Sequence, residues 1–272
     1  MPSIGIVGGS GFYELLEGAT ERRVKTPFGE PSDAVVTGTF GGKEVAFLPR
    51  HGRGHRIPPH RINYRANIWA LCELGVERVL LPCAVGSLKP ELVPGVFVVL
   101  DQFVDRTSGR TLTFYDGDLP PDHPRTGPVT HVSMAEPYCP ELRAAAVASL
   151  DAMGRAYQDG GTIVVIQGPR FSTRAESQWF SAAGWDVVGM TQVPEAQLAR
   201  ELAMCVAGVA MVTDHDAGLE GHPDVTPVSN QEVIEVFGAN VTHVKDLVGR
   251  VVGSLAVERD CTCGTALEGA SF

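Results

Sequence analysis

Short runs of β-branched and apolar residues recur along the chain and are separated by stretches of helical composition. A short apolar run bounded by glycine or polar residues is typical of a buried strand, whereas a longer stretch that ends at glycine indicates a helix. Strands are predicted at residues 4–7, 34–40, 44–48, 79–85, 96–104, 162–166, 187–190 and 205–211. Helices are predicted at residues 61–74, 140–153, 172–183, 194–203 and 231–258. This alternation predicts an α/β fold with a central mixed, mostly buried β-sheet flanked by helices.

The composition indicates one globular unit. Of the 272 residues, 44% are hydrophobic and 20% are charged, and no linker rich in proline, glycine or serine divides the sequence. We therefore expect a single domain over residues 1–272, with a short flexible tail from about residue 259. A formal net charge of −10 argues against nucleic acid or an anionic membrane as a partner. Because no long apolar run and no N-terminal targeting signal are visible, we expect a cytoplasmic protein.

Six cysteines in a chain of this length do not form the pattern of a secreted disulfide framework. Four of them lie in apolar stretches and are expected to be small buried side chains, namely Cys72, Cys83, Cys139 and Cys205. The other two form the pair Cys261-Thr262-Cys263. A structural zinc site needs four ligands, and no second Cys or His pair follows at finger spacing. We therefore expect no metal site, and we favour a local disulfide or two free thiols.

Two acidic side chains follow the apolar run at 205–211, in the stretch Val212-Thr213-Asp214-His215-Asp216-Ala217-Gly218. Open α/β sheets bind ligands at the carboxyl ends of their strands. Residues two positions apart also point to the same side of an extended backbone. Asp214 and Asp216 are therefore candidates for a ligand site. The alternative from position alone is an acidic cap at the start of a helix.

Two further stretches suit an anion such as phosphate. Gly8-Gly9-Ser10-Gly11 follows the first strand, where such a loop exposes backbone N–H groups and Ser10 adds a hydroxyl donor. Arg50-His51-Gly52-Arg53-Gly54-His55-Arg56 follows the strand at 44–48 and concentrates positive charge in an acidic chain. The alternatives are a simple tight turn and a solvated basic turn. Neither stretch matches a Walker A loop or a dinucleotide-binding fingerprint.

Two later stretches suit a nucleoside. Gly168-Pro169-Arg170-Phe171-Ser172-Thr173 places an aromatic ring beside hydroxyl donors, which suits a flat heterocycle. The alternative is a helix capped by Ser172 or Thr173, with Glu176 completing a capping box. Gly189-Met190-Thr191 offers an apolar side chain for a sugar face and a hydroxyl for an anion. Since no GxSxG, HExxH or kinase motif is present, we expect chemistry that depends on positioning and electrostatics.

Together these stretches resemble the trimeric purine nucleoside phosphorylase family, and within it the S-methyl-5′-thioadenosine phosphorylases. The resemblance runs from about Ile4 to Cys263, which is nearly the whole chain. Its strongest parts are Gly8-Gly9-Ser10-Gly11, Arg50-His51-Gly52-Arg53-Gly54-His55, Asn63-Tyr64-Arg65-Ala66-Asn67-Ile68-Trp69-Ala70-Leu71 and residues 168–177. Met134-Ala135-Glu136-Pro137 and Thr213-Asp214-His215-Asp216 add to them.

The resemblance implies a role for each residue that matches the motifs of the family. Phosphate would be bound by Ser10, Arg50, His51, Thr191 and the backbone amide of Ala84. The nucleoside would contact Val85, Gly86, Phe171, Ser172, Met190, Asp214 and Asp216, with Asn230 and Val233 at its 5′ end. A neighbouring subunit would lend His131 to the 5′ pocket, which implies a homotrimer or a hexamer. Cys83 and Asn230 depart from the family pattern, in which a Thr or Ser and a Val are common.

The implied function is phosphate-dependent cleavage of the N-glycosidic bond of 5′-deoxy-5′-methylthioadenosine to adenine and 5-methylthioribose 1-phosphate. No cofactor is expected, because phosphate is a co-substrate. Asp214 would be catalytic and donate a proton near N7 of the leaving base, and Asp at this position favours a 6-aminopurine. One alternative is a phosphorylase that prefers 6-oxopurine or other 5′-modified nucleosides. The others are a hydrolytic nucleosidase and a non-catalytic nucleoside-binding protein.

Overall fold

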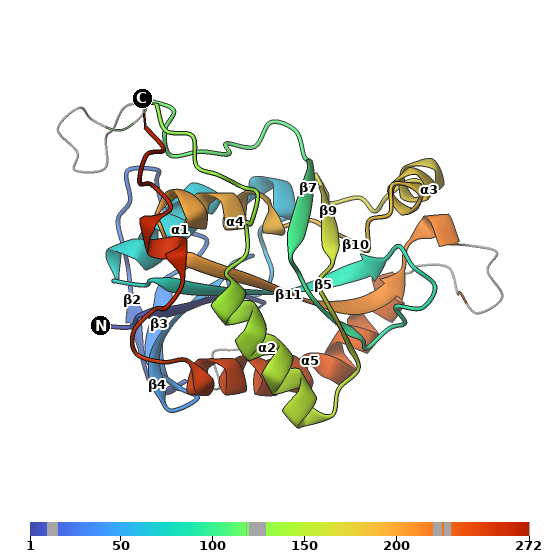
Figure 1. Cartoon of the computed structure of the whole chain (residues 1–272), viewed down its shortest axis with the longest axis horizontal. Helices are drawn as coiled ribbons and strands as arrows, with labels where there is room; N and C mark the ends of the chain where they lie inside the picture. Colours follow the sequence, from blue (N-terminus) through green and yellow to red (C-terminus); the bar gives the residue numbers. More distant parts are fainter. Residues whose placement is uncertain (10–15, 118, 120–128, 220–224, 226–229, 272) are drawn as a thin grey trace.

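The computed structural model describes residues 1–9, 16–117, 119, 129–219, 225 and 230–271. Its helices are α1 (Tyr64–Glu73), α2 (Pro140–Met153), α3 (Arg174–Ala182), α4 (Gln192–Glu201) and α5 (Asn230–Ser254). Short 3-10 helices are η2 (Pro59–Arg61), η3 (Ala217–Leu219) and η4 (Thr262–Thr265). Figure 1 shows α1 and α4 on one side of a central sheet, α2 and α5 on the other, and α3 at one end. The predicted α/β class is confirmed.

The sheet is mixed and contains eleven strands of the described residues. They are β1 (Ile4–Gly8), β2 (Glu17–Arg22), β3 (Val35–Phe40), β4 (Lys43–Pro49), β5 (Arg78–Ser87), β6 (Phe97–Val99), β7 (Gln102–Arg106), β8 (Tyr157–Asp159), β9 (Thr162–Ile166), β10 (Val187–Gly189) and β11 (Cys205–His215). The main path runs β2-β3-β4-β1-β5-β10-β9-β7, and a branch carries β11, β6 and β8 from β5. β5 is parallel to β1 and β11 and antiparallel to β10, so it joins the two parts of the sheet.

The strand β11 is buried along its whole length because both faces of the sheet are covered. Val206 and Val212 belong to the hydrophobic core that also contains residues of α1 and α4. Val209 and Met211 belong to a second core, with residues of α2 and α5. This alternation explains why the strand appears in the sequence as a continuous apolar run.

One predicted strand is divided in the structure. The stretch at 96–104 forms β6 and β7, because its backbone changes hydrogen-bond partners between them. The N–H of Leu100 donates to the Gly208 carbonyl in β11 at 3.0 Å, whereas the N–H of Asp101 donates to the Gly161 carbonyl before β9 at 3.2 Å. The strands β2 and β8 were not predicted. β2 is exposed at every position and therefore has no hydrophobic alternation to detect.

The strand β11 continues to His215, four residues beyond its predicted end at Met211. Asp214 therefore lies within the strand and Asp216 follows directly after it. The carboxyl ends of β5 and β11 run side by side to this point, with Asp214 opposite Gly86. Among the described residues, no helix combines the length and apolar character that a membrane span needs.

The chain after α5 is packed against the rest of the molecule. Figure 1 shows this segment, coloured red, running from the end of α5 along one side to the C-terminus. Arg259 Nη1 donates to the Ala203 carbonyl at 3.0 Å, and Cys263 in η4 is only 2% exposed. The segment that we expected to be a flexible tail thus makes specific contacts.

Candidate active site

A cavity of about 680 Å³ lies where the carboxyl ends of β5, β10 and β11 meet. Its volume is within the range of pockets that bind small molecules. Eleven residues identified in the sequence line it together: Arg50, His51, Ala84, Val85, Gly86, Phe171, Ser172, Met190, Thr191, Asp214 and Asp216. The other lining residues are Gly9, His55, Pro59, Pro82, Cys83, Ile166, Val188, Gly189, Thr213, Gly238, Val241 and Val244.

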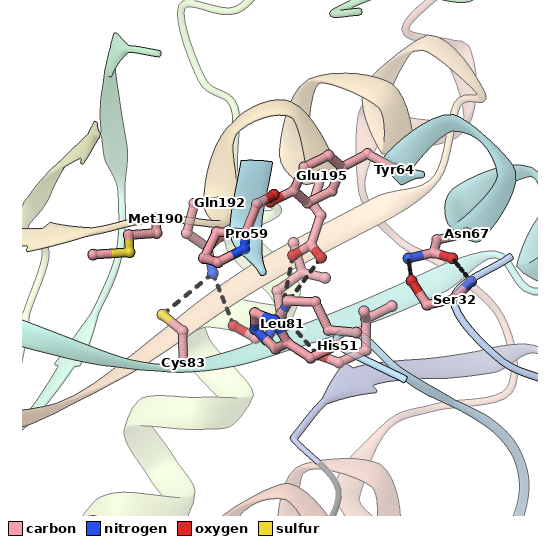
Figure 2. Close-up of polar contacts among 12 residues, drawn as sticks. Ser32, His51, Pro59, Tyr64, Asn67, Leu81, Cys83, Met190, Gln192 and Glu195 are labelled. Atoms are coloured by element: carbon pink, nitrogen blue, oxygen red, sulfur yellow. Dashed lines mark hydrogen bonds and ion pairs between the residues drawn. The ribbon is translucent and has the colours of Figure 1, made fainter. Parts of the chain in front are cut away.

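Arg50 is held in the cavity wall by Glu195 of α4. Arg50 Nε and Nη2 donate to the two carboxylate oxygens of Glu195 at 2.7 and 2.9 Å. Arg50 Nη2 also donates to the Val7 carbonyl at 2.8 Å, and Nη1 donates to the Pro82 carbonyl at 3.0 Å. Both charged side chains are buried. Figure 2 shows the Glu195 carboxylate pointing from its helix toward the strands.

This ion pair determines what Arg50 can offer a ligand. Burial lowers the pKa of Arg50, but Glu195 outweighs burial and the pKa is raised overall, while burial raises the pKa of Glu195. We treat the pair as ionised, because guanidinium stays protonated in proteins and the bidentate contact satisfies both charges. The bonds among the described residues use four of the five guanidinium N–H groups, which leaves one on Nη1 for an anion. In the sequence, Glu195 is the second residue of the helix predicted at residues 194–203, and no motif there indicated its contact with Arg50.

His51 lies beside Arg50, with Nδ1 at 2.8 Å from the Ile57 carbonyl. Because a carbonyl only accepts, we assign the proton to Nδ1, and Nε2 of the neutral ring is then an acceptor. Burial and the Arg50 charge lower the pKa of His51 to about 4, so the ring is neutral near pH 7. The ring of His55 stacks on it with centroids 4.1 Å apart. His51 can therefore donate to phosphate, as we expected, only when Nε2 is also protonated. A nearby anion favours this protonated form because it stabilises the positive charge of the ring.

Thr191 and the end of β5 continue the wall. Thr191 is buried at the start of α4, and its hydroxyl makes no capping hydrogen bond to the helix. Ala84 is exposed on the cavity wall next to Cys83. Gln192 Nε2 donates to Cys83 Sγ at 3.5 Å, as Figure 2 shows. Burial raises the pKa of Cys83 to about 11, so this departure from the family pattern places a neutral thiol in the cavity.

Asp214 and Asp216 come together at a β-bulge. The register between β11 and β5 shifts at Thr213, and such a bulge re-aims the side chains around it. Thr213 Oγ1 donates to Asp214 Oδ1 at 2.7 Å, which fixes the carboxylate. A Cβ on Gly86 would lie 3.2 Å from Asp214 Oδ2 and 3.5 Å from Asp216 Cβ. Both acidic side chains therefore lie next to Gly86. A β-bulge brings them together, whereas we expected a regular extended backbone to do so.

Ser172 Oγ and Asp216 Oδ2 are buried at the cavity, and neither makes a hydrogen bond of normal geometry among the described residues, although the Ser172 hydroxyl is near enough to lower the pKa of Asp216. Buried polar groups are normally satisfied, so both atoms are available to a ligand. Burial raises the pKa of Asp216. Thr173 caps α3 and Glu176 completes the capping box, which leaves Ser172 to the cavity. Asp216 does precede η3, as the capping alternative predicted, but one of its oxygens is not used there.

The cavity also has an apolar wall, to which Val85, Phe171 and Met190 contribute. Arg110 fixes the backbone behind this wall, a role that no motif in the sequence indicated. Its Nη1 donates to the Met190 carbonyl at 2.9 Å, and its Nη2 donates to the Gln167 carbonyl at 2.8 Å. The segments after β9 and β10 are thereby joined through one side chain.

Three predicted site residues lie outside the part that the structure describes in detail. Ser10 lies outside the described residues. Asn230 begins α5, and the side chains of Asn230 and Val233 are likewise not described. Gly238 and Val241 from the same helix line the cavity, so α5 forms part of its wall.

His131 lies away from the cavity lining of its own chain. Its side chain is exposed, and its backbone N–H donates to the Ala270 carbonyl at 2.8 Å. The neighbouring Thr130 forms a β-bridge with Ser271. The C-terminal residues therefore fix the backbone on which His131 is presented.

The cavity and the fold can be compared with those of known proteins. The sequence profile of the phosphorylase superfamily matches residues 3–253. The chain belongs to the phosphorylase superfamily. The matched range of this superfamily member includes Arg50 and the acidic pair of the cavity, Asp214 and Asp216.

The relatives of this superfamily member are phosphorylases whose names differ in the nucleoside substrate. It is 55% identical to the purine nucleoside phosphorylase of Streptomyces coelicolor, over 98% of this chain and 94% of the relative. It is 50% identical to the 6-oxopurine nucleoside phosphorylase of Pyrococcus furiosus, over the full length of both. It is 49% identical to the S-methyl-5′-thioadenosine phosphorylase of Thermofilum pendens, over 97% of each chain.

Solved structures show the same fold. The methylthioadenosine phosphorylase of Schistosoma mansoni, in complex with adenine, matches this superfamily member with a TM-score of 0.89 and 38% identity. The match covers 100% of this chain and 99% of the other. The predicted fold and the predicted family are therefore both confirmed.

Proposed function

We propose that this protein cleaves 5′-deoxy-5′-methylthioadenosine with inorganic phosphate and releases adenine and 5-methylthioribose 1-phosphate. The arrangement along β5 carries the proposal. Arg50 bonds to the Pro82 carbonyl, and Asp214 lies over Gly86, which is four residues or about 13 Å further along the strand. This separation suits a phosphate at one end and a purine at the other. The relatives named as methylthioadenosine phosphorylases, and the adenine complex among them, support this substrate.

The phosphate would be bound by one corner of the cavity. The remaining N–H of Arg50, the hydroxyls of Ser10 and Thr191 and the amide of Ala84 would donate to its oxygens. His51 would join them as an imidazolium, stabilised by the dianion. Because Glu195 fixes Arg50, the phosphate would be held in one position against C1′, which makes an intermolecular attack effectively intramolecular. The scheme uses phosphate as co-substrate and no cofactor.

The purine leaves with negative charge, so the other corner must supply a proton or a strong donor. We assign this role to Asp214, which Thr213 orients. Asp216 lies beside it, and burial raises the pKa of Asp216, which is the direction that favours its protonated form. The hydroxyl of Ser172 would contact another edge of the base.

The acidic pair also bears on the choice of base. A carboxylate accepts from a 6-amino group, whereas O6 of a 6-oxopurine would face it as a second acceptor. The mismatch costs about 1–3 kcal/mol, or roughly 5–150-fold, which is a preference and not an exclusion. The 50% identity to a 6-oxopurine nucleoside phosphorylase favours a second candidate function, the phosphorolysis of 6-oxopurine nucleosides.

A comparison of four substrates tests the proposal. We would measure kcat/KM in phosphate buffer for adenosine, inosine and the 5′-methylthio derivative of each. The proposed function predicts the highest value for 5′-deoxy-5′-methylthioadenosine. The highest value for inosine would instead establish the second candidate, and binding of all four without turnover would leave a nucleoside-binding protein.

We further propose a homotrimer, or a hexamer built from it, in which His131 reaches the 5′ pocket of a neighbouring subunit. Its exposure on a fixed backbone outside its own cavity supports this assignment. Sedimentation should then give three or six times the 29.0 kDa chain mass, and a monomer would overturn the assignment.

We place the protein in the cytoplasm, a setting that its six free thiols support.

A further inference from the structure

Four cysteines from distant parts of the chain converge at the start of β11. Cys205 is the first residue of the strand, Cys139 precedes α2, and Cys261 and Cys263 belong to the C-terminal segment at η4. Their sulfur atoms all lie within 4.8 Å of one another, and the sulfurs of Cys205 and Cys261 are 3.3 Å apart. All four are free thiols.

This spacing is close to that of a tetrahedral tetrathiolate site. Zinc–sulfur bonds of about 2.3 Å place the four sulfurs of such a site about 3.8 Å apart. Shifts of about 1 Å or less would bring the four thiols onto one ion. A disulfide needs only two sulfurs at about 2.05 Å, so it does not account for the convergence of all four.

Two arginines border the four sulfurs. Arg200 Nη1 lies 3.7 Å from Cys263 Sγ. Arg259 Nη1 donates to the Ala203 carbonyl at 3.0 Å, two residues before Cys205 in the chain. Gly264 lies against this guanidinium, since a Cβ there would lie 3.1 Å from Arg259 Nη2.

The charges of these arginines fit a metal–thiolate group. A divalent ion with four thiolates carries a net charge of −2, which two neighbouring guanidinium groups offset. Neutral thiols or disulfides would give the two cations no such partner. Glu77 lies 3.6 Å from Arg259 but is half exposed, so it screens this cation only in part.

We propose that Cys139, Cys205, Cys261 and Cys263 bind one soft divalent metal ion of the zinc class in a closed, structural site. Four protein ligands leave no open position, which is the pattern of a structural site and not of a catalytic one. Binding converts each thiol into a thiolate and releases its proton to solvent, so no oxidant or reductant is involved.

The ion would join the C-terminal segment to the start of β11 and to the start of α2. The backbone is already arranged for this, because the N–H of Cys139 donates to the Val206 carbonyl at 2.8 Å. Asp214 lies nine residues further along β11, or about 30 Å away. The site would therefore act on stability and leave the proposed chemistry unaffected, so it does not depend on the proposed function.

No local sequence motif indicates this cluster, because its cysteines are distant in the chain. A zinc-finger motif would have a second Cys or His pair near the CxC motif, and the sequence has none there. The fold instead supplies Cys139 and Cys205 from residues far upstream. A metal at this position would correct our expectation of a local disulfide or two idle thiols.

Elemental analysis of the wild-type protein tests the proposal directly. Protein purified under reducing conditions without added chelator should contain about one equivalent of zinc per chain. A strong chelator should remove it and lower Tm by about 5 °C or more, and zinc alone should restore Tm. Cobalt in its place should give the charge-transfer and d–d bands of a tetrahedral thiolate site. Absence of bound metal, together with no effect of added zinc on Tm, would overturn the proposal.

Thiol titration of the denatured, chelated protein separates the metal site from disulfides. The proposal predicts that all six cysteines react without reductant. If only Cys72 and Cys83 reacted, the four clustered cysteines would be paired in two disulfides, which would contradict the proposal. Cys263→Ser should lower the zinc content and Tm while changing kcat/KM less than twofold. Cys72→Ser, a cysteine outside the cluster, is the matched control and should keep its zinc.

Discussion

Asp214 is the residue on which the proposed recognition of the base depends. Asp214→Asn replaces an acceptor oxygen with a donor amide of the same size. We expect the ratio of kcat/KM for inosine to that for 5′-deoxy-5′-methylthioadenosine to increase by about 5–150-fold. The rate with the 6-aminopurine should fall as well, because the proposed proton donor is lost. Steady-state kinetics measure both values, and an unchanged ratio would show that Asp214 does not read the base.

Glu195 is the residue that fixes Arg50. Glu195→Gln leaves a buried guanidinium without its counter-charge, which costs about 3–5 kcal/mol in free energy of unfolding. The KM for phosphate should rise, because Arg50 loses its fixed orientation. Urea unfolding and phosphate kinetics measure the two effects.

The control for this variant is Glu21→Gln. It makes the same chemical change in an exposed ion pair with Arg53, at 2.7 Å. Such a pair contributes about 1 kcal/mol or less, so the control should be close to wild type. Equal effects of the two variants would contradict the role given to Glu195.

At the residue scale, the sequence predicted which side chains meet but not how they bond. Arg50 and Asp214 each lie at the carboxyl end of a strand, and such ends converge in an α/β sheet. Glu195 pairs with Arg50 across 145 residues, and one sequence contains no local signal for such a contact. The free nitrogen of His51 depends on the Ile57 carbonyl, whose direction the side-chain pattern does not determine.

At the element scale, Thr191 before α4 and Thr213 in β11 are expected to serve different ligands. Thr191→Val removes a buried hydroxyl that makes no capping hydrogen bond. We expect the KM for phosphate to rise by about 10–100-fold, since hydrogen bonds to charged groups are the stronger ones. Thr213→Val removes the donor to Asp214 Oδ1, and it should lower kcat with little change in the KM for phosphate. Equal phosphate effects from both variants would contradict this division.

The elements themselves were largely predictable where burial leaves a pattern. β5 and β11 are apolar runs because helices cover both faces of the sheet. β2 is exposed throughout and was missed, and the division between β6 and β7 depends on which neighbour each backbone group pairs with. The bulge at Thr213 is equally invisible in composition, because it is a shift in register against β5.

At the scale of the whole molecule, the stability should depend on pH through His51. Its pKa in the folded protein is about 4, below the ordinary value near 6.5. Between these values the unfolded chain binds more protons, so the contribution is complete above about pH 6.5 and is lost as pH falls toward 4. The loss amounts to about 3 kcal/mol at most.

Urea unfolding between about pH 4 and 7 measures this dependence. His51→Gln should flatten the decrease in free energy of unfolding, whereas His60→Gln, which removes an exposed imidazole, should follow the wild type. If His51→Gln kept the wild-type slope, the acid sensitivity would have to come from other groups.

The molecule as a whole shows what a single sequence leaves open. The alternation of strands and helices predicted the α/β class, because each element must bury its apolar face against another. The meeting of Cys139 and Cys205 with the CxC pair was not predicted, since it depends on the path of the C-terminal segment after α5. The same holds for the cavity. Sequence motifs identified eleven of the residues that line it, whereas the contacts among these residues depend on the fold.

The most direct test of the proposed reaction is the release of adenine from 5′-deoxy-5′-methylthioadenosine, measured with and without phosphate and with the sugar product identified. The arrangement of Arg50, Thr191 and Asp214 predicts that adenine appears only with phosphate, together with an equal amount of 5-methylthioribose 1-phosphate. Adenine released equally fast in phosphate-free buffer, with free 5-methylthioribose as the sugar product, would contradict it.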